Sequence, residues 1–279
     1  MTTTAPPQPR VWFITGASRG LGRAFTEAAL TGGDRVIATA RDVSPLDDLV
    51  ATHDGALVTL PLDISDHAAV VSTMDKAAAV FGGLDVVLNS AGQFLLGMIE
   101  ETTEQQARAH LDTNFFGALW VAKAAIPHLR RRGGGRLLQV SSMGSVGGHA
   151  SVGLYGAGKA ALEAMTEALA MEVAQFGIAV TVLNAGGYDT GLFTKGLTNT
   201  EPDPAYADLR AELAAMWSEG ASDDPAKAAA VVRDIVNMPE PPRRVILGGT
   251  SFDIVRDIAR QRQADLERWE ELSRAAGRG

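Results

Sequence analysis

Short apolar runs rich in β-branched residues alternate with longer segments of helical periodicity along almost the whole chain. We expect strands at residues 11–14, 35–40, 56–62, 84–89, 136–141, 178–184 and 243–247, and helices at 21–30, 44–52, 66–81, 103–132, 154–176 and 225–237. Strands that are apolar on both faces and alternate with helices form parallel sheets covered on both sides. The sequence therefore predicts a single doubly wound α/β domain of the Rossmann type, with a parallel seven-stranded sheet and helices on both faces.

The segments outside this pattern divide the chain into three parts. We expect a flexible tail at residues 1–10 and the Rossmann-type domain at residues 11–250, with an irregular lid at about 187–220. Residues 251–279 are expected to form a helical extension. One face of the helix expected at 253–275 collects Ile254, Ile258, Leu266, Trp269 and Leu272. Two interpretations of this face stay open: it packs on the body for stability, or it forms a pocket wall or a dimer contact.

Composition argues against several classes of function. A formal net charge of −8 disfavours a main role in nucleic-acid binding, and the absence of cysteine excludes disulfides, thiolate catalysis and Cys-ligated metals. No metal site is expected, because no metal-ligand spacing links the five histidines, whose default place is a surface or a loop: His53, His67, His110, His128 and His149. The chain has no apolar run of membrane-spanning length and no secretory signal, so we expect a soluble cytoplasmic protein without a membrane partner.

A glycine-rich segment joins the first expected strand to the first expected helix. Such a loop lets the backbone approach a pyrophosphate, and the helix N-terminus offers free amides to that anion. The expected cofactor contacts in this segment are Gly16, Ser18, Arg19, Gly20, Leu21 and Gly22. The alternative interpretation is an ordinary turn between a strand and a helix.

The residues that follow the second strand indicate which dinucleotide would bind. NAD-binding proteins usually have an acid there for the ribose 2′-hydroxyl, whereas this chain has Arg41. Arg41 and Arg19 together favour the 2′-phosphate of NADP(H), through charge-assisted hydrogen bonds. Asp42 is the competing candidate, since its carboxylate could take the part of the usual acid.

Further motifs follow in a fixed order along the chain. An NSAG segment occupies residues 89–92, Tyr155 and Lys159 form a YxxxK pattern, and Ser142 lies thirteen residues before Tyr155. Together with the TGxxxGxG pattern at residues 15–22, these motifs resemble those of the short-chain dehydrogenase/reductase family, over about residues 11–247. Two positions depart from the family pattern: Ser90 replaces an asparagine, and Ala185 replaces the proline of PGxxxT, which is expected to loosen the loop over the nicotinamide.

The resemblance implies roles for individual residues. The catalytic set is Asn114, Ser142, Tyr155 and Lys159. The cofactor contacts beyond the glycine loop are Asp63 and Ile64 near the adenine, Asn89, Ala91 and Gly92, Tyr155 and Lys159, and Gly186 with Thr190. The resemblance also implies a homodimer or homotetramer, assembled through the helices at 103–132 and 154–176.

The chemistry of these side chains supports the same interpretation. A tyrosine has a pKa of about 10, too high for fast proton exchange near neutrality, and a nearby ammonium lowers it. Lys159 lies one helical turn after Tyr155, on the same face. Ser142 is suited to polarise a substrate oxygen by donating a hydrogen bond. The resemblance alone implies that Asn114 holds a water linking Lys159 to solvent.

We therefore expect an NADP(H)-dependent oxidoreductase that interconverts a carbonyl and a secondary alcohol on a hydrophobic small molecule, with tyrosine as general acid or base. The candidate substrate contacts are Phe94, His149, Tyr188 and Phe193. Two alternatives stay open. One is a redox-neutral relative, such as an epimerase, isomerase or lyase, that uses the same site, and the other is a regulatory protein that senses NADP(H).

Overall fold

The computed structural model describes residues 8–218 and 222–277, with side chains except those of residues 217 and 218. Residues 1–7 of the expected tail and residues 219–221 around the end of the expected lid lie outside the described residues. Arg10, also assigned to the flexible tail, is instead held in place. Its backbone N–H donates to the Asp34 carboxylate at 2.9 Å, and its guanidinium donates to Asn237.

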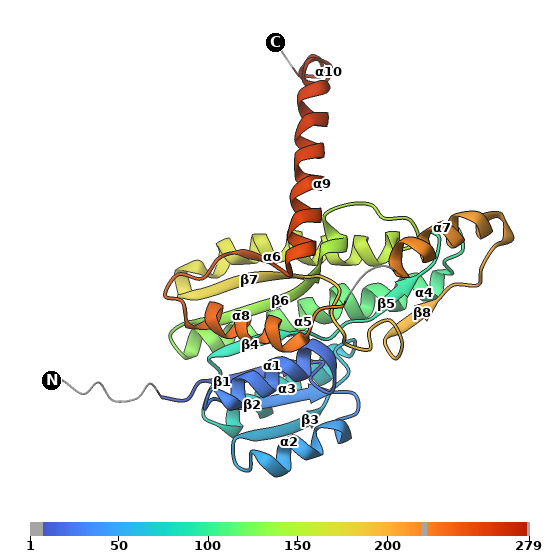
Figure 1. Ribbon diagram of the computed structural model, residues 1–279. Helices are drawn as coiled ribbons and strands as arrows, with labels where there is room; N and C mark the ends of the chain where they lie inside the picture. Colours follow the sequence, from blue (N-terminus) through green and yellow to red (C-terminus); the bar gives the residue numbers. More distant parts are fainter. Residues whose placement is uncertain (1–7, 219–221, 278–279) are drawn as a thin grey trace.

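A parallel seven-stranded sheet forms the centre of the molecule (Figure 1), which confirms the predicted fold class. The order along the sheet is β3-β2-β1-β4-β6-β7-β9. The strands are β1 Val11–Thr15, β2 Arg35–Ala40, β3 Leu57–Pro61, β4 Val86–Asn89, β6 Gly135–Ser142, β7 Ile178–Ala185 and β9 Arg244–Leu247. Because β2 lies on one side of β1 and β4 on the other, the strand order reverses at β1, the position where open α/β sheets bind ligands.

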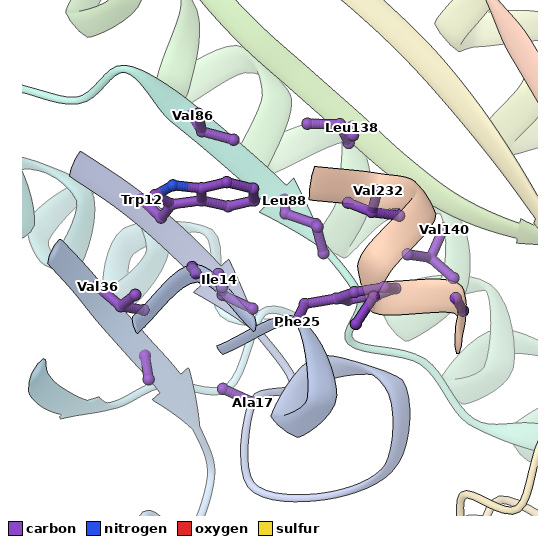
Figure 2. Close-up of a cluster of buried hydrophobic side chains, with 14 of the residues drawn as sticks. Trp12, Ile14, Ala17, Phe25, Val36, Val86, Leu88, Leu138, Val140 and Val232 are labelled. Atoms are coloured by element: carbon purple, nitrogen blue, oxygen red, sulfur yellow. The ribbon is translucent and has the colours of Figure 1, made fainter. Parts of the chain in front are cut away.

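Helices cover both faces of this sheet. They are α1 Gly20–Thr31, α2 Asp47–Thr52, α3 His67–Val80, α4 Glu104–Leu111, α5 Ala118–Arg131, α6 Gly153–Val173 and α8 Pro225–Asn237. Trp12 of β1 packs with Phe25 of α1 and Val232 of α8 on one face (Figure 2). The next residue, Phe13, points to the opposite face and joins the core under α3, α5 and α6, as the alternation of side chains along a strand requires.

The long helix expected at 103–132 is divided in two. A π-helical segment, Asp112–Gly117, separates α4 from α5, and Pro127 lies inside α5. Segments of this kind are rare and occur often at functional sites. Here the segment carries Asn114, whose side-chain amide donates to the carbonyl of Gln93 at 2.9 Å.

The lid contains elements that the apolar pattern did not predict, whereas the C-terminal extension is helical as expected. β5 Phe94–Leu96 pairs in parallel with β8 Leu197–Asn199, and α7 Ala207–Ser218 follows. Helices α9 Gly249–Arg268 and α10 Glu270–Ala275 rise away from the rest of the molecule (Figure 1). Leu266 and Leu272 are each 68% exposed and Trp269 is 50% exposed, so the first interpretation, in which the whole face packs on the body, is wrong for this distal part.

Candidate active site

The carboxyl ends of β1 and β4 are joined by one side chain. The hydroxyl of Thr15 donates to Asn89 and accepts the backbone N–H groups of Ser90 and Ala91, both at 3.1 Å. Asn89 also donates to Gln139 of β6 at 3.0 Å. The carboxyl ends of β1 and β4 therefore form a fixed edge that is bonded to β6, and Asn89 and Ala91, two of the expected cofactor contacts, lie on it.

The glycine loop lies directly above this edge. Gly16 has a positive φ of 66°, and a Cβ on it would lie 2.7 Å from the Cα of Ala91. A Cβ on Gly22 would lie 2.2 Å from the carbonyl oxygen of Gly16. No side chain caps the N-terminus of α1 and its first turn has no acid, so its amides face the loop without a competing carboxylate. Ser18 and Leu21 are half-buried beside it.

Arg41 and Asp42, which are expected to determine which dinucleotide binds, follow β2, and Asp63 follows β3. Asp42 already accepts the backbone N–H of Ser44 at 3.0 Å and its hydroxyl at 2.7 Å. Burial of Asp63 opposes its ionisation, but hydrogen bonds from Ser65 and the charge of Arg41 outweigh burial and lower the pKa of Asp63. Arg41 and Asp63 are therefore neighbours, and the side chain of Arg41 is exposed.

A glycine also allows the expected catalytic side chains to approach one another. A Cβ on Gly92 would lie 2.9 Å from Oδ1 of Asn114 and 3.5 Å from Nζ of Lys159. Asn114 is buried, and its Oδ1 accepts the backbone N–H of Gln93 at 3.2 Å. The structure thus places Asn114 and Lys159 beside the same glycine.

Tyr155 and Ser142 form the other half of the catalytic group. Ser142 is the last residue of β6, and its Oγ accepts the N–H of Gly144 at 3.2 Å. Burial raises the pKa of Tyr155, and a hydrogen bond with Ser142 acts in the opposite direction. The sequence expectation was that a neighbouring ammonium lowers this pKa. The structure differs because burial is the larger influence on the buried phenol.

Lys159 lies beneath Tyr155 in the same helix. Its ammonium donates to the carbonyl of Val140 at 2.9 Å. Burial lowers the pKa of Lys159 to about 8, and the negative charge of Glu163 acts against this shift. A lysine with a pKa close to neutrality is suited to pass a proton.

Of the four expected substrate contacts, Phe94 lies against Tyr155, and Phe193 lies against Phe94. The ring of Phe94 is 4.5 Å from that of Tyr155, centroid to centroid, and 5.0 Å from that of Phe193. Phe94 and Tyr155 pack in a small apolar cluster with Val152, Leu96, Leu192 and Leu197. This cluster is the apolar wall of the site.

The other two expected contacts are placed differently. His149 lies in the loop that leads to α6, and its Nε2 is buried with no hydrogen-bond partner within the described residues. Tyr188 is instead buried in the core under α8, where its side chain lines a cavity with Asp223, Lys227 and Gly248. The structure therefore does not bring Tyr188 together with Phe94 and Tyr155.

The segment after β7 approaches the glycine loop. A Cβ on Gly20 would lie 2.6 Å from Cβ of Thr190, and the hydroxyl of Thr190 accepts the N–H of Leu192 at 3.3 Å. Gly186 lies against Ser251, at the start of α9. Ile64 is buried beneath the π-helical segment, where it contacts Gly117.

A buried carboxylate that sequence reasoning missed connects to both Ser142 and Lys159. Glu163 accepts the hydroxyl of Ser141 at 2.6 Å and is also bonded to Ser145, Asn184 and Arg244. Asn184 and Ser145 in turn donate to the carbonyl of Ser142, at 3.1 and 2.7 Å. The available signal was an acid one turn after Lys159, on the face that packs inward.

His110 was also misjudged, because a surface or loop position was expected for it. The imidazole is buried one turn before Asn114, whose amide nitrogen lies 3.1 Å from its Nδ1. Burial, together with the charge of Lys159, lowers the pKa of His110 to about 4. His110 is therefore a neutral neighbour of the catalytic group at ordinary pH.

Comparison with known proteins identifies the family. The family model described as short chain dehydrogenase matches residues 10–201. The chain belongs to the short-chain dehydrogenase family. A protein from Botryotinia fuckeliana named as an oxidoreductase is 36% identical over 271 residues, which cover 96% of this chain and 99% of the relative.

Solved structures of short-chain dehydrogenases agree with this fold. One from Streptomyces avermitilis is 38% identical, covers 97% of this chain and 100% of its own, and superposes with a TM-score of 0.91. Another, from Burkholderia cenocepacia, was solved in complex with NADP. It is 25% identical over 93% of this chain and 97% of its own, with a TM-score of 0.73. This protein is thus a short-chain dehydrogenase by sequence and by fold.

Proposed function

We propose that this short-chain dehydrogenase is an NADP(H)-dependent reductase of hydrophobic ketones or aldehydes, which also catalyses the reverse oxidation. The observation that carries the proposal is the convergence of Asn114 and Lys159 at Gly92, with Tyr155 one turn before Lys159 on α6 and the uncapped N-terminus of α1 nearby. Ser142, hydrogen-bonded to Tyr155, completes the group. A protein that only senses a nucleotide has no need for such a buried proton-transfer set.

The residues of the glycine loop fit a dinucleotide. The close approaches at Gly16 and Gly22 leave backbone where any side chain would intrude, and α1 offers its amides to a pyrophosphate. The exposed Arg41 supports a 2′-phosphate, since the carboxylate of Asp42 is engaged by Ser44. The NADP bound to the relative from Burkholderia cenocepacia supports the same choice.

Each candidate catalytic side chain then has its own role in carbonyl reduction. When bound, NADPH supplies the hydride that adds to the carbonyl carbon. Tyr155, kept protonated by its raised pKa, donates its proton to the carbonyl oxygen. Ser142 donates a hydrogen bond to that oxygen, and Lys159 returns a proton toward Tyr155. In the oxidation of an alcohol, Tyr155 accepts the proton instead.

The apolar wall supports a hydrophobic substrate. Phe94 and Val152 are buried against Tyr155, and Phe193 is 51% exposed next to Phe94. A substrate with an apolar body would cover the exposed part of Phe193, which favours binding by about 25 cal/mol for each Å² of apolar surface removed from water. The proposed substrate therefore has a carbonyl beside an extended apolar part.

The decisive test is NADPH consumption against a panel of ketones and aldehydes, with Tyr155→Phe in parallel. The wild type should turn over apolar carbonyl compounds, and the variant should lose at least about 100-fold in kcat while it still binds NADPH, because only the transferable proton is removed. Cofactor binding is followed by nucleotide fluorescence. Retention of full activity by Tyr155→Phe would refute the role of the tyrosine.

A second variant tests the choice of cofactor. Arg41→Ala should raise the KM for NADPH by about 10-fold or more and leave that for NADH nearly unchanged, because only NADPH carries the 2′-phosphate. Steady-state kinetics with both cofactors provide the measurement. Equal effects on the two KM values would contradict the proposed contact.

A further inference from the structure

Helices α9 and α10 present a stripe of side chains, here called the seam, whose distal half no other part of the described chain covers. The two helices span 27 residues, or roughly 40 Å at 1.5 Å per residue. The backbone hydrogen bonds continue through their junction, since Trp269 N–H donates to Asp265 and Ser273 N–H to Trp269. Helices in water owe most of their stability to the packing of an apolar face, which is missing for the distal half of this one.

The side chains of this seam follow a heptad pattern. Positions alternately three and four residues apart form one stripe, as in a coiled coil. The stripe contains Val255, Ile258, Arg262, Asp265, Trp269 and Leu272. Its two ends are apolar, and its middle holds one cation followed by one anion.

The two central charges of the seam, unlike several other charges on these helices, have no partner within the helix. Arg256, Arg260 and Arg274 each form an ion pair within the helix that carries them. Arg262 and Asp265 are exposed, and neither takes part in an ion pair or a side-chain hydrogen bond among the described residues. The seam therefore offers two unmatched charges of opposite sign, next to exposed apolar side chains.

We propose that this seam is an interface with a second copy of the chain, in which the two helices pair antiparallel about a point between Gln263 and Ala264. In that register Arg262 of each copy faces Asp265 of the other. Ile258 faces Trp269, and Val255 faces Leu272. Each pairing occurs twice because the arrangement is two-fold symmetric. A parallel pair would instead place Arg262 against Arg262 and Asp265 against Asp265.

The proximal end of the seam is consistent with this arrangement. Val255 and Ile258 are half-buried, and Ile258 contacts Gly147 in the loop before α6. The distal end is more exposed, at Trp269 and Leu272. Antiparallel pairing brings the exposed distal end of one copy onto the half-covered proximal end of the other. The two bodies then lie at opposite ends of the helix pair.

Charge reversal tests both the interface and its register. Arg262→Asp and Asp265→Arg each place like charges across the seam, so each should weaken association at least 10-fold, and the double variant Arg262→Asp/Asp265→Arg should restore it. The assembly mass of the full chain is measured by analytical ultracentrifugation over a range of concentrations. The matched controls, Arg260→Asp and Glu267→Arg, reverse charges on the opposite face and should leave the mass unchanged.

Cysteine pairs provide a second test that tolerates some loss of affinity. Because the chain contains no cysteine, Ile258→Cys/Trp269→Cys introduces the only two thiols. They lie eleven residues apart on one helix, roughly 16 Å, too far for a disulfide within one chain. We expect disulfide-linked dimers on mild oxidation, and none from the control Arg260→Cys/Glu267→Cys.

Three results would overturn the proposal. The first is an assembly mass that neither single reversal lowers, and the second is a double reversal that fails to restore association. The third is a purified chain that stays monomeric without cross-linking, which would assign the seam to a different partner. None of these measurements depends on the proposed reductase activity, so failure of one proposal leaves the other standing.

Discussion

The candidate catalytic residues could be proposed from sequence because the pattern that marks them is local. Tyr155 and Lys159 share one helical turn, and the structure places them as that spacing predicts. Glu163 is one further turn along, but its importance depends on Arg244, which comes 81 residues later. A sequence does not reveal such a partner, because only the packing of β7 and β9 beside α6 brings it close.

At the scale of single residues, Glu163 should act as a positioning residue for Lys159. The charged and titratable groups around Lys159 are Tyr155 and Glu163 from α6 and His110 from α4, with Arg244 of β9 bonded to Glu163. The carboxylate of Glu163 raises the pKa of Lys159, so Glu163→Gln should lower it. Lysine then loses its proton at lower pH, and the alkaline limb of the pH profile for carbonyl reduction should move to lower pH.

The measurement is the pH dependence of kcat/KM for NADPH oxidation, with thermal melting as a check on folding. Glu167→Gln is the matched control, because Glu167 also binds Arg244 but is exposed and contacts none of the serines. We expect its alkaline limb to match that of the wild type. An unchanged limb in Glu163→Gln would show that the carboxylate has only a structural role.

At the scale of elements, the strands were predictable and their interruptions were not. Each strand of the seven-stranded sheet contains a short apolar run, whereas β5 and β8 have three residues each and pair across about a hundred positions. The π-helical segment adds one residue to a turn, which shifts the hydrophobic pattern by only one position within a region that is helical on both sides. Tyr188 was misplaced for a related reason: it follows β7 directly, but its parallel bridge to Asp223 turns it into the core.

Glu101 links the lid to the loop before α4 through several hydrogen bonds. Glu101 accepts hydrogen bonds from Arg210 in α7, from the hydroxyl of Thr200 and from the backbone of Asp203. Together these bonds lower the pKa of Glu101 to about 2, and the bond from Arg210 has the largest effect. An acid with a lowered pKa keeps its partners until the pH falls through that value, so this link should persist throughout pH 5–8.

Replacing this carboxylate should loosen the lid without disturbing the cofactor site. Glu101→Gln is expected to raise the KM for an apolar carbonyl substrate by several-fold and to speed proteolysis within residues 197–218, with the KM for NADPH unchanged. Glu104→Gln breaks an exposed ion pair with Arg108 on the same side of the molecule and serves as the control. If both variants changed the KM values and the rate of proteolysis equally, a specific link between Glu101 and the lid would be refuted.

At the scale of the whole molecule, contacts within one chain do not account for the exposed apolar side chains of α9 and α10. The sequence showed an apolar face there but left open what covers it, since periodicity reveals a face and not its partner. An uncovered helix tip opens readily, and its amides then exchange with solvent nearly as fast as those of an unfolded chain.

Pairing with a second copy changes that expectation in a measurable way. Amides in residues 263–275 should exchange slowly in the wild type, and more slowly as protein concentration rises, because dimerisation removes the opened state by mass action. In Arg262→Asp the same segment should exchange fast at every concentration, while the core strands β1 and β4 keep their protection. Hydrogen exchange read by mass spectrometry resolves the two regions. Slow exchange that is independent of concentration in both proteins would mean that the helix is stable alone, and the seam would then need no second copy.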